Sequence, residues 1–379
     1  MKAKIKKLDL PLLMAMIIFL IFGLIMIFSA SNVSAVLRYQ VPTTHFFKRQ
    51  LVFILAALFV GFTIVLRVPT KKYRFFGILY FLGSILALFL IFVYGKVAGG
   101  AKSWYALGSL SVNLQPIEFA KTALIIFLSI YYSVVYRLKS RPIVVTIIPF
   151  IITAIIAVLI VLQPDLGGAL IICAIMGLLY LTLPDDKKSK SNLIKIVIVG
   201  GVLFLAVLLY SGSNFIDNYQ LKRLKFSHPC SRYIEDTGYQ VCNGFIAMHN
   251  GGFLGRGLGK STQKYLYLPE AHTDFIFPII VEELGYVGGL AVIFGYAFML
   301  YRILNIARRA KTIQNQVLSY GCLFYMLIHI MINLLGVLAL MPLTGVPLPF
   351  LSYGGSYTVN LILMVFIVER VSIENNSVK

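Results

Sequence analysis

The sequence predicts an all-α membrane protein that crosses the bilayer ten times. Of the 379 residues, 59% are hydrophobic and only 13% are charged, about half the charged share of an ordinary soluble domain. The apolar residues form continuous runs that approach the ~20 residues a membrane-spanning helix needs. Because these runs do not alternate with polar residues, they predict helices rather than the strands of a barrel. This composition excludes a soluble enzyme, a nucleic-acid-binding domain and a secreted disulfide scaffold.

Ten apolar segments are the candidate spans, and we expect them to form a single membrane domain over residues 1–379. In chain order they are 11–30, 51–66, 75–94, 117–135, 143–162, 167–183, 193–211, 275–300, 319–340 and 357–371. The first follows a basic tail without a small-residue cleavage site, so we interpret it as a retained span rather than a signal peptide. One long polar loop, 212–273, separates the seventh and eighth segments.

The distribution of basic residues predicts which ends of the spans face the cytoplasm. Both tails and the even-numbered connections hold 20 Lys and Arg, whereas the odd-numbered connections other than 212–273 hold 5. Short cytoplasmic loops are enriched in basic residues, and long loops are exempt from this rule. We therefore expect both termini in the cytoplasm and the 212–273 loop outside. The net charge of +20 follows from this topology and predicts no nucleic-acid partner.

Segment 95–121 contains the only Trp of the chain, Trp104, and ends with Glu118 and Lys121 just inside a span. These two side chains lie three residues apart and share one helix face. An ionisable pair at the membrane boundary is costly and often functional. The alternative is structural, in which Lys121 reaches the interface and pairs with Glu118.

Segment 163–168 reads QPDLGG and forms a tight outer turn between two spans. Asp165 is positioned to cap the following helix by accepting its free N–H groups. The functional alternative is that Gln163 and Asp165 line a cavity.

Segment 341–356 reads MPLTGVPLPFLSYGGS, and its prolines and glycines forbid a regular helix. Irregular backbone near a membrane is tolerated where it is buried in protein or lines a wet cavity. Ser352, Gly354, Gly355 and Ser356 directly precede the last span. Their N–H groups would form a helix N-terminus that favours an anion.

The 212–273 loop carries two basic clusters, a glycine-rich stretch and two cysteines. Gly251, Gly252, Gly255, Gly257 and Gly259 are expected to form a flexible stretch, and without a preceding strand they do not predict a nucleotide-binding loop. Cys230 and Cys242 lie on the oxidising side, where a disulfide would stabilise the local fold by roughly 3 kcal/mol. Asp274 stands directly before a span, where it either caps the helix or acts as a general base.

Six strings resemble the SEDS family, which includes FtsW and RodA. They are QPIEFAK, QPDLGGAL, GYQ (238–240), NGGFLGRGLG, LPEAHTDFIFPIIVEELG (268–285) and TGVPLPFLSYGGS (344–356). They follow the family's order over nearly the whole chain, and the last two are long and specific. The string FSASNVSA (28–35) favours the FtsW branch over RodA. One departure is Ser103, where the family usually has Arg, which affects the contact to phosphate.

The resemblance implies a peptidoglycan glycosyltransferase in the bacterial cytoplasmic membrane. Such proteins polymerise lipid II on the outer face, release undecaprenyl pyrophosphate and work with a class B penicillin-binding protein. The family's essential aspartate falls on Asp274. The implied substrate-binding residues are Lys121, Glu118, Trp104, Gln163, Asp165, Gln240, Lys264, Glu270, His272, Ser352, Gly354, Gly355 and Ser356.

The chemistry of this transfer predicts the roles of these residues. Asp274 would take the proton of the acceptor hydroxyl, and Lys121 with the basic residues of the long loop would stabilise the leaving pyrophosphate. A divalent cation, Mg²⁺ or Mn²⁺, is a candidate cofactor for the same purpose. A lipid substrate suits a groove open sideways to the bilayer. The alternatives are a lipid II flippase, which would need a polar path through the membrane, and a scaffold that only recruits the transpeptidase.

Overall fold

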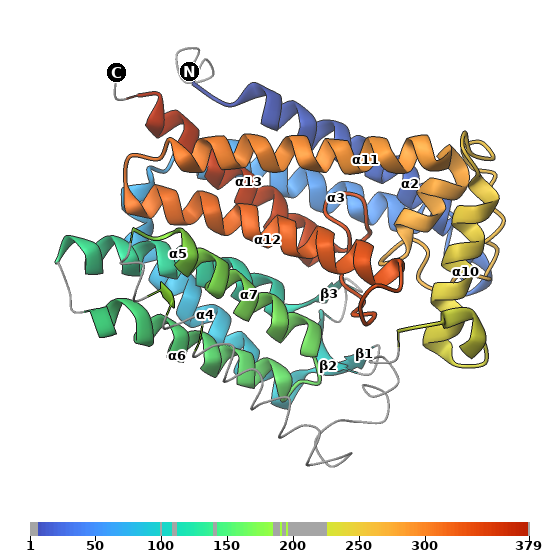
Figure 1. Ribbon diagram of the computed structural model, residues 1–379, viewed down its shortest axis with the longest axis horizontal. Coiled ribbons are helices and arrows are strands. Elements are labelled where there is room, and N and C mark those ends of the chain that lie inside the picture. The colour runs from blue at the N-terminus through green and yellow to red at the C-terminus, as the bar shows by residue number, and fades with distance from the viewer. Residues whose placement is uncertain are drawn as a thin grey trace.

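The computed structural model describes residues 7–98, 101–107, 112–138, 142–184, 190, 191, 195 and 226–377, and it confirms the all-α membrane fold. Long helices lie side by side in one bundle (Figure 1). They are α2 (Leu10–Leu37), α3 (His45–Val60), α4 (Tyr73–Tyr94), α5 (Pro116–Arg137), α6 (Pro142–Val161), α7 (Leu166–Thr182), α11 (Ile276–Arg308), α12 (Ile313–Val337) and α13 (Gly355–Asn375).

Eight of these helices are long and apolar enough to cross a membrane, and α7 is an apolar helix of 17 residues. They correspond to nine of the ten expected spans, and the expected span 193–211 lies outside the described residues. Several boundaries differ from the prediction: helix α2 extends to Leu37, beyond the predicted end at residue 30, and α12 begins at Ile313, before the predicted start at residue 319. Helix α3 begins at His45, before the predicted start at residue 51, because Lys48 and Arg49 at its N-terminal end remain helical. At its C-terminal end the helix continues through a π turn, η1 (Gly61–Val65). Helix α11 extends to Arg308, beyond the predicted end at residue 300.

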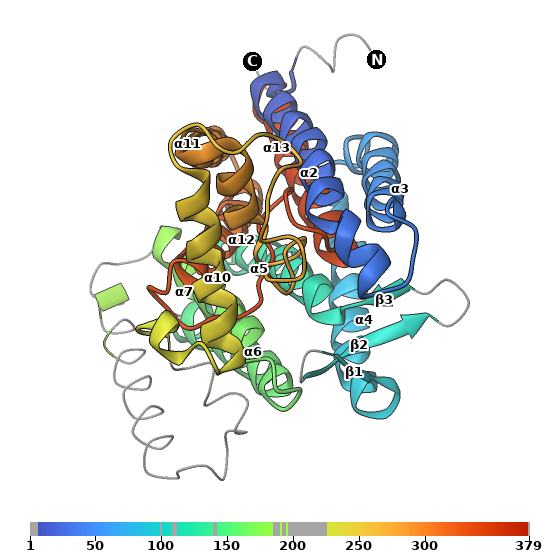
Figure 2. The same cartoon turned by 90° about the vertical axis from the view of Figure 1, so that its right-hand side faces the viewer.

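Both termini lie at one end of the bundle (Figure 1). The Lys7 Nζ donates to Ser377 Oγ over 3.3 Å, and Arg302 pairs with Asp9 over 2.6 Å at the start of α2. Asp9 also caps α2 by accepting from the Leu12 N–H. The opposite end carries the polar segments that the sequence analysis expects to lie outside, which are called the outer segments below. Figure 2 looks onto that end and shows helix α10 (Asp236–Gly251) lying across it.

A small antiparallel sheet follows α4. The sequence analysis did not predict this sheet. Its strands are β1 (Lys96–Ala98), β2 (Ala101–Leu107) and β3 (Val112–Leu114), in the order β1-β2-β3. The Tyr105 hydroxyl donates to the Ala87 carbonyl over 2.6 Å and attaches the sheet to α4. This sheet leads the chain directly into α5.

The described part of the 212–273 loop is folded rather than flexible. It contains a 3₁₀ turn, η5 (Pro229–Arg232), and the helix α10. A disulfide between Cys230 and Cys242 joins this turn to the helix. The expected flexibility of the glycine stretch is wrong. A Cβ on Gly251 would lie 2.1 Å from the Val281 carbonyl oxygen, so the glycines allow this segment to pack directly against α11.

Helix α11 is interrupted at Gly285, whose φ of 72° and ψ of −178° are not helical. The kink frees backbone groups that must find other partners inside a membrane protein. The glycine stretch supplies these partners. The N–H groups of Arg256 and Gly257 donate to the carbonyls of Glu282 and Glu283, and Tyr286 N–H donates to Gly252.

The disulfide leads to a testable prediction about the stability of the outer end. Replacing Cys230 and Cys242 together by serine should lower the free energy of unfolding by roughly 3 kcal/mol, because the unfolded chain regains the entropy of the open loop. Thermal unfolding measured with and without reductant should give the same difference for the wild-type chain. Complete alkylation of both thiols in intact, unreduced protein would show that the bond does not form.

Candidate active site

The 341–356 loop is the point where the outer segments meet. Tyr353 N–H donates to the His272 carbonyl over 2.9 Å, which attaches the loop to the end of the long loop. Gln115 N–H donates to Ser356 Oγ over 3.2 Å at the start of α5. Gly167 is so close to Thr344 that a Cβ there would lie 3.2 Å from the Thr344 Cβ. Segments far apart in the sequence therefore form one outer site.

Asp274 lies where this loop meets the start of α11. A Cβ placed on Gly345 would be 3.7 Å from Asp274 Oδ2, so the carboxylate lies beside the 341–356 loop. Its other oxygen, Oδ1, lies 3.1 Å from the Thr273 hydroxyl. Asp274 is partly accessible rather than buried. These contacts hold the carboxylate in place and leave it within reach of a substrate.

Asn333 of α12 fixes the backbone of this site, and the sequence analysis did not single it out. Its Nδ2 donates to the carbonyls of both Asp274 and Val346, each over 2.8 Å. Its Oδ1 is buried without a hydrogen-bond partner among the described residues. A buried acceptor of this kind is a position for a water molecule or a substrate hydroxyl. Its sequence signal is an amide inside an apolar span.

Replacing Asn333 by leucine should reduce both stability and activity. The change leaves two backbone carbonyls without a donor, which costs roughly 1–3 kcal/mol for each buried group, and it releases the backbone of Asp274. The matched control is Gln314→Leu, because Gln314 also donates from α12 to a backbone carbonyl, that of Thr70, but at the opposite end of the bundle. Equal losses of glycan synthesis per folded molecule in both variants would contradict the role of Asn333.

Glu270 is connected to Asp274 through one hydroxyl. Thr273 Oγ1 lies 3.0 Å from Glu270 Oε2 and 3.1 Å from Asp274 Oδ1. The other oxygen of Glu270 pairs with Arg38, at the end of α2, over 3.6 Å. The structure thus brings together the predicted residues Glu270 and Asp274, and it adds Arg38 to the site.

His272 is buried in an aromatic cluster beneath the site. Its ring centroid lies 4.4 Å from that of Phe46 and 5.7 Å from that of Tyr353. Burial lowers the pKa of His272 to about 4, and the charge of Arg38 contributes to the shift. The imidazole is therefore neutral at neutral pH, and its position between rings gives it a packing role that orients the 270–274 segment.

Glu118 and Lys121 are fully buried and form an ion pair, as the structural alternative predicted, but Lys121 does not reach the interface. Lys121 Nζ donates to Glu118 Oε1 over 2.7 Å, and the Tyr325 hydroxyl donates to Glu118 Oε2 over 2.9 Å. Lys121 Nζ also lies 3.1 Å from His329 Nε2. Because an ammonium only donates, His329 Nε2 must accept and its Nδ1 must carry the hydrogen. Nδ1 then donates to the Tyr325 carbonyl over 2.6 Å.

The buried pair and the Asp274 site are connected through helix α12. His329 and Asn333 are four residues apart and therefore lie on one face of the helix, one turn from each other. His329 contacts Lys121, and Asn333 holds the backbone of Asp274. The ammonium has three N–H groups, and Glu118 and His329 accept from two of them. The third has no hydrogen-bond acceptor among the described residues.

The start of α13 is less open to an anion than the sequence indicated. Gly354 N–H already donates to Gln50 Oε1 over 3.2 Å, and the Ser352 side chain accepts from Leu348 N–H over 2.8 Å. Ser356 Oγ is engaged by Gln115. Gly355 packs against Phe53, where a Cβ would lie 2.5 Å from the ring. These residues shape the 341–356 loop and hold it against α3.

Most basic residues of the long loop that the structure describes are paired with acids of α11 or of the loop itself, so they are not available to a leaving group. Lys264 is buried and pairs with Glu283 over 3.0 Å, and Arg256 lies 3.6 Å from Glu282. Arg232 pairs with Glu235 over 3.0 Å. Buried carboxylates require such compensation. The basic residues at 222–225 lie outside the described residues.

Four other predicted site residues have structural contacts. Asp165 caps α7 by accepting from Gly168 N–H over 2.8 Å, and Gln163 donates to the Leu88 carbonyl over 2.9 Å. Trp104 is half-buried on β2, where it is paired with Lys96 of β1. Gln240 is half-buried on α10. Within the described residues, no three or more His, Cys, Asp or Glu side chains converge to form a metal cage.

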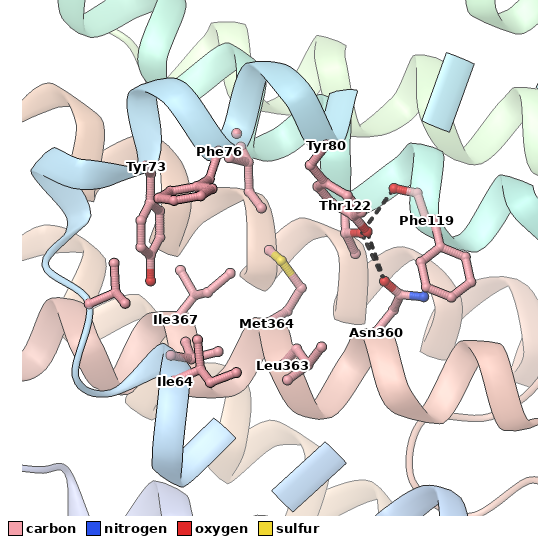
Figure 3. Close-up of a pocket in the computed structure, with 14 residues that line it drawn as sticks. Ile64, Tyr73, Phe76, Tyr80, Phe119, Thr122, Asn360, Leu363, Met364 and Ile367 are labelled. Carbon is pink, nitrogen blue, oxygen red and sulfur yellow. Dashed lines mark hydrogen bonds between the residues drawn. The ribbon is translucent and has the colours of Figure 1, made fainter. Parts of the chain in front are cut away.

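An apolar cavity of about 430 Å³ lies between η1, α4, α5 and α13 (Figure 3). Phe76, Leu363 and Met364 are among its lining residues. Its polar groups are concentrated where the Thr122 hydroxyl donates to Asn360 Oδ1 over 3.0 Å and bonds to Tyr80 over 2.8 Å. Those bonds satisfy the polar groups internally, so the remaining surface suits a hydrocarbon chain.

Comparisons with known proteins agree with the fold and the motifs. Residues 10–377 match the FtsW/RodA/SpoVE family model, described as a cell cycle protein. The chain is 38% identical to the probable peptidoglycan glycosyltransferase FtsW of Bacillus subtilis, over 98% of this chain and 92% of that one. It is 34% identical to the protein of the same name from Francisella salina, over 99% of this chain and 91% of that one.

Two solved structures show the same fold. One is a chain of a peptidoglycan synthase complex that coordinates polymerization and crosslinking, with a TM-score of 0.74 and 23% identity over 97% of this chain and 98% of that one. The other is the rod shape determining protein RodA of Thermus thermophilus, with a TM-score of 0.66 and 24% identity over 96% of each chain. On its motifs, its membrane-spanning helices and these matches, the chain belongs to the FtsW/RodA/SpoVE family of multi-pass membrane cell cycle proteins.

Proposed function

We propose that this chain is a peptidoglycan glycosyltransferase that polymerises lipid II. The observation that carries the proposal is Asp274, a partly accessible residue whose backbone carbonyl accepts from Asn333 and whose carboxylate accepts from the Thr273 hydroxyl. The relatives at 38% and 34% identity are named probable peptidoglycan glycosyltransferases, which supports the same activity.

In this proposal, Asp274 is the general base. It takes the proton of the acceptor sugar's hydroxyl while that oxygen forms a bond to the anomeric carbon of the donor. The bond between this carbon and the pyrophosphate oxygen breaks, and the undecaprenyl pyrophosphate leaves. An α-linked donor then gives a β-linked glycan in one inverting displacement, without a covalent sugar–enzyme intermediate.

The negative charge that develops on the pyrophosphate requires compensation. Arg49 hydrogen-bonds with the Tyr353 side chain beside His272, so it brings positive charge to the site. Lys121 is a further candidate for this role, and its ammonium would first have to leave its buried ion pair with Glu118. A divalent cation is a further candidate. Mg²⁺ needs only one or two carboxylates when substrate phosphates complete its shell, so it would supply charge neutralisation without a cage of protein ligands.

The lipid part of the substrate suits the apolar cavity between α4 and α13 (Figure 3). Phe76 on its wall is 65% exposed, which fits a groove that faces lipid. We place both termini in the cytoplasm and the Asp274 site on the outer side. The reason is that the basic connections gather at the end of the bundle where the termini lie. The cytoplasmic membrane of a bacterium is therefore the proposed location.

A class B penicillin-binding protein is the proposed partner, because the polymer must be crosslinked after synthesis. The solved synthase complex, which coordinates polymerization and crosslinking and contains a chain of this fold, supports the pairing. The sequence analysis favoured the FtsW branch, and the FtsW relatives support a role in division rather than elongation.

The glycosyltransferase and flippase proposals differ in what they do to the substrate. The purified chain should be placed in liposomes that carry labelled lipid II in both leaflets. Glycosyltransferase activity predicts that outer-leaflet label becomes glycan and that undecaprenyl pyrophosphate is released. Movement of label between leaflets without any release of the pyrophosphate would favour the flippase and contradict our proposal.

A further inference from the structure

A second pocket, of about 390 Å³, lies between the end of α2 and residues 264–272 on the outer side. Its lining combines apolar side chains with a polar rim. The apolar residues include Leu37, Leu266 and Leu268, and the rim includes Arg38, Tyr39 and Glu270. Apolar walls with a few convergent polar groups are typical of a site for a small organic ligand. The family motif implies that Lys264, Glu270 and His272 of this lining bind substrate, but neither the motif nor the mechanism above says which part of the substrate occupies the pocket.

Glu270 connects this pocket to Asp274. Its φ of 56° is unusual for a residue other than glycine, and the conformation is held because its carbonyl accepts from the N–H groups of Thr273 and Phe275. The strained backbone directs the carboxylate to Arg38 on one side and to the Thr273 hydroxyl on the other. That hydroxyl also contacts Asp274. A ligand in the pocket would therefore lie one hydroxyl away from the proposed base.

The charges of the pocket decide which part of the substrate fits. Arg38 is neutralised by Glu270, and Lys264 is occupied by Glu283. The pocket thus offers no excess positive charge, and Glu270 would repel a pyrophosphate. The site suits a neutral group with several hydroxyls, which can bond to both members of the Arg38–Glu270 pair.

Tyr39 adds a surface that suits a sugar ring. Tyr39 is 40% exposed. The Phe46 ring centroid lies 5.3 Å from the Tyr39 ring centroid, and the guanidinium carbon of Arg38 lies 5.5 Å from it. A sugar presents an apolar C–H face and polar edges, so it can pack on an aromatic ring and bond to the rim at the same time. Both features are present within this one pocket.

We propose that this pocket is the subsite for the acceptor sugar, in which Tyr39 and Glu270 bind the sugar and direct its hydroxyl to Asp274. The proposal rests on the glycosyltransferase function given above. It assigns the acceptor to the α2 side of Asp274. The donor pyrophosphate then lies on the side of the 341–356 loop, near Arg49.

The test separates the two substrates chemically. A lipid II capped at its acceptor hydroxyl serves only as donor, and an analogue with a non-cleavable phosphonate in place of the pyrophosphate link serves only as acceptor. Tyr39→Ala and Glu270→Gln should each raise the KM for the acceptor roughly tenfold, about 1.4 kcal/mol. The KM for the donor should stay unchanged, and kcat should change less than the acceptor KM. A merely structural role would not produce this split.

Tyr265→Ala is the matched control, because Tyr265 is also an exposed tyrosine of the outer segment but does not line the pocket. It should leave both KM values unchanged. An unchanged acceptor KM in the Tyr39 and Glu270 variants, or an equal rise for the donor, would overturn the subsite while the glycosyltransferase function stands. A wild-type chain that couples no donor to acceptor would overturn the function itself, and the subsite with it.

Discussion

The Asp274→Asn variant should lose glycan synthesis from lipid II by ~10²–10⁴-fold, the usual cost of removing a general base. Asparagine has nearly the same size and still accepts a hydrogen bond from Thr273, but it cannot take a proton at neutral pH. The bond from Asn333 goes to the backbone carbonyl of residue 274 and survives the change. The variant should therefore insert, fold and bind lipid II as the wild type does.

The control for this variant is a carboxylate that does cap a helix, at the opposite end of the bundle. Asp9 precedes α2, accepts from Leu12 N–H and pairs with Arg302. Asp9→Asn should keep the capping bond and weaken the ion pair, so the melting temperature falls slightly and the rate per folded molecule is unchanged. If Asp274→Asn shows only this modest loss of stability with normal turnover, Asp274 is a helix cap and not the base.

The second large effect concerns the buried pair of Glu118 and Lys121. Lys121→Ala or Lys121→Met should destabilise the bundle by roughly 3–5 kcal/mol, because Glu118 is left as an uncompensated buried charge. The role in stabilising the leaving pyrophosphate, which the sequence analysis assigns to Lys121, predicts a loss of rate rather than of stability. The complete burial of both side chains changes that expectation.

A double variant separates the structural role of Lys121 from its catalytic one. Glu118→Gln with Lys121→Met removes both charges, so the melting temperature should return close to that of the wild type. The rate per folded molecule should remain at least tenfold lower, since a positive group near the leaving pyrophosphate is missing. A double variant that polymerises at the wild-type rate would make Lys121 purely structural.

The spans were predictable because the length of an apolar run is set by the thickness of the bilayer. The same criterion explains the errors at their ends. Lys48 and Arg49 interrupt the apolar pattern, although a helix continues through them. The strands β1 and β3 have three residues each and carry too little pattern for a prediction. Helix α10 was missed because it lies in a polar loop and is stabilised by packing on α11 and by a disulfide.

The site was predictable where motifs carry it, and not where long-range contacts do. Asp274, Glu270 and Glu118 could be named from their positions beside spans. The roles of Asn333 and His329 depend on which helix faces which, and a single sequence does not contain that information. Their polar side chains within an apolar span were nevertheless a usable signal. The same signal marks Glu282 and Glu283, whose carboxylates accept from the N–H groups of Thr262 and Ser261, just after the glycine stretch.

The central claim is that this chain itself forms the glycosidic bonds. Its most direct test is the purified wild-type protein in detergent, incubated with labelled lipid II alone and with a penicillin-binding protein whose own catalytic residue has been removed. Products are separated by size. The account predicts glycan chains of many disaccharide units and released undecaprenyl pyrophosphate under at least one of these two conditions. Chains that appear only after a separate glycosyltransferase is added would contradict it.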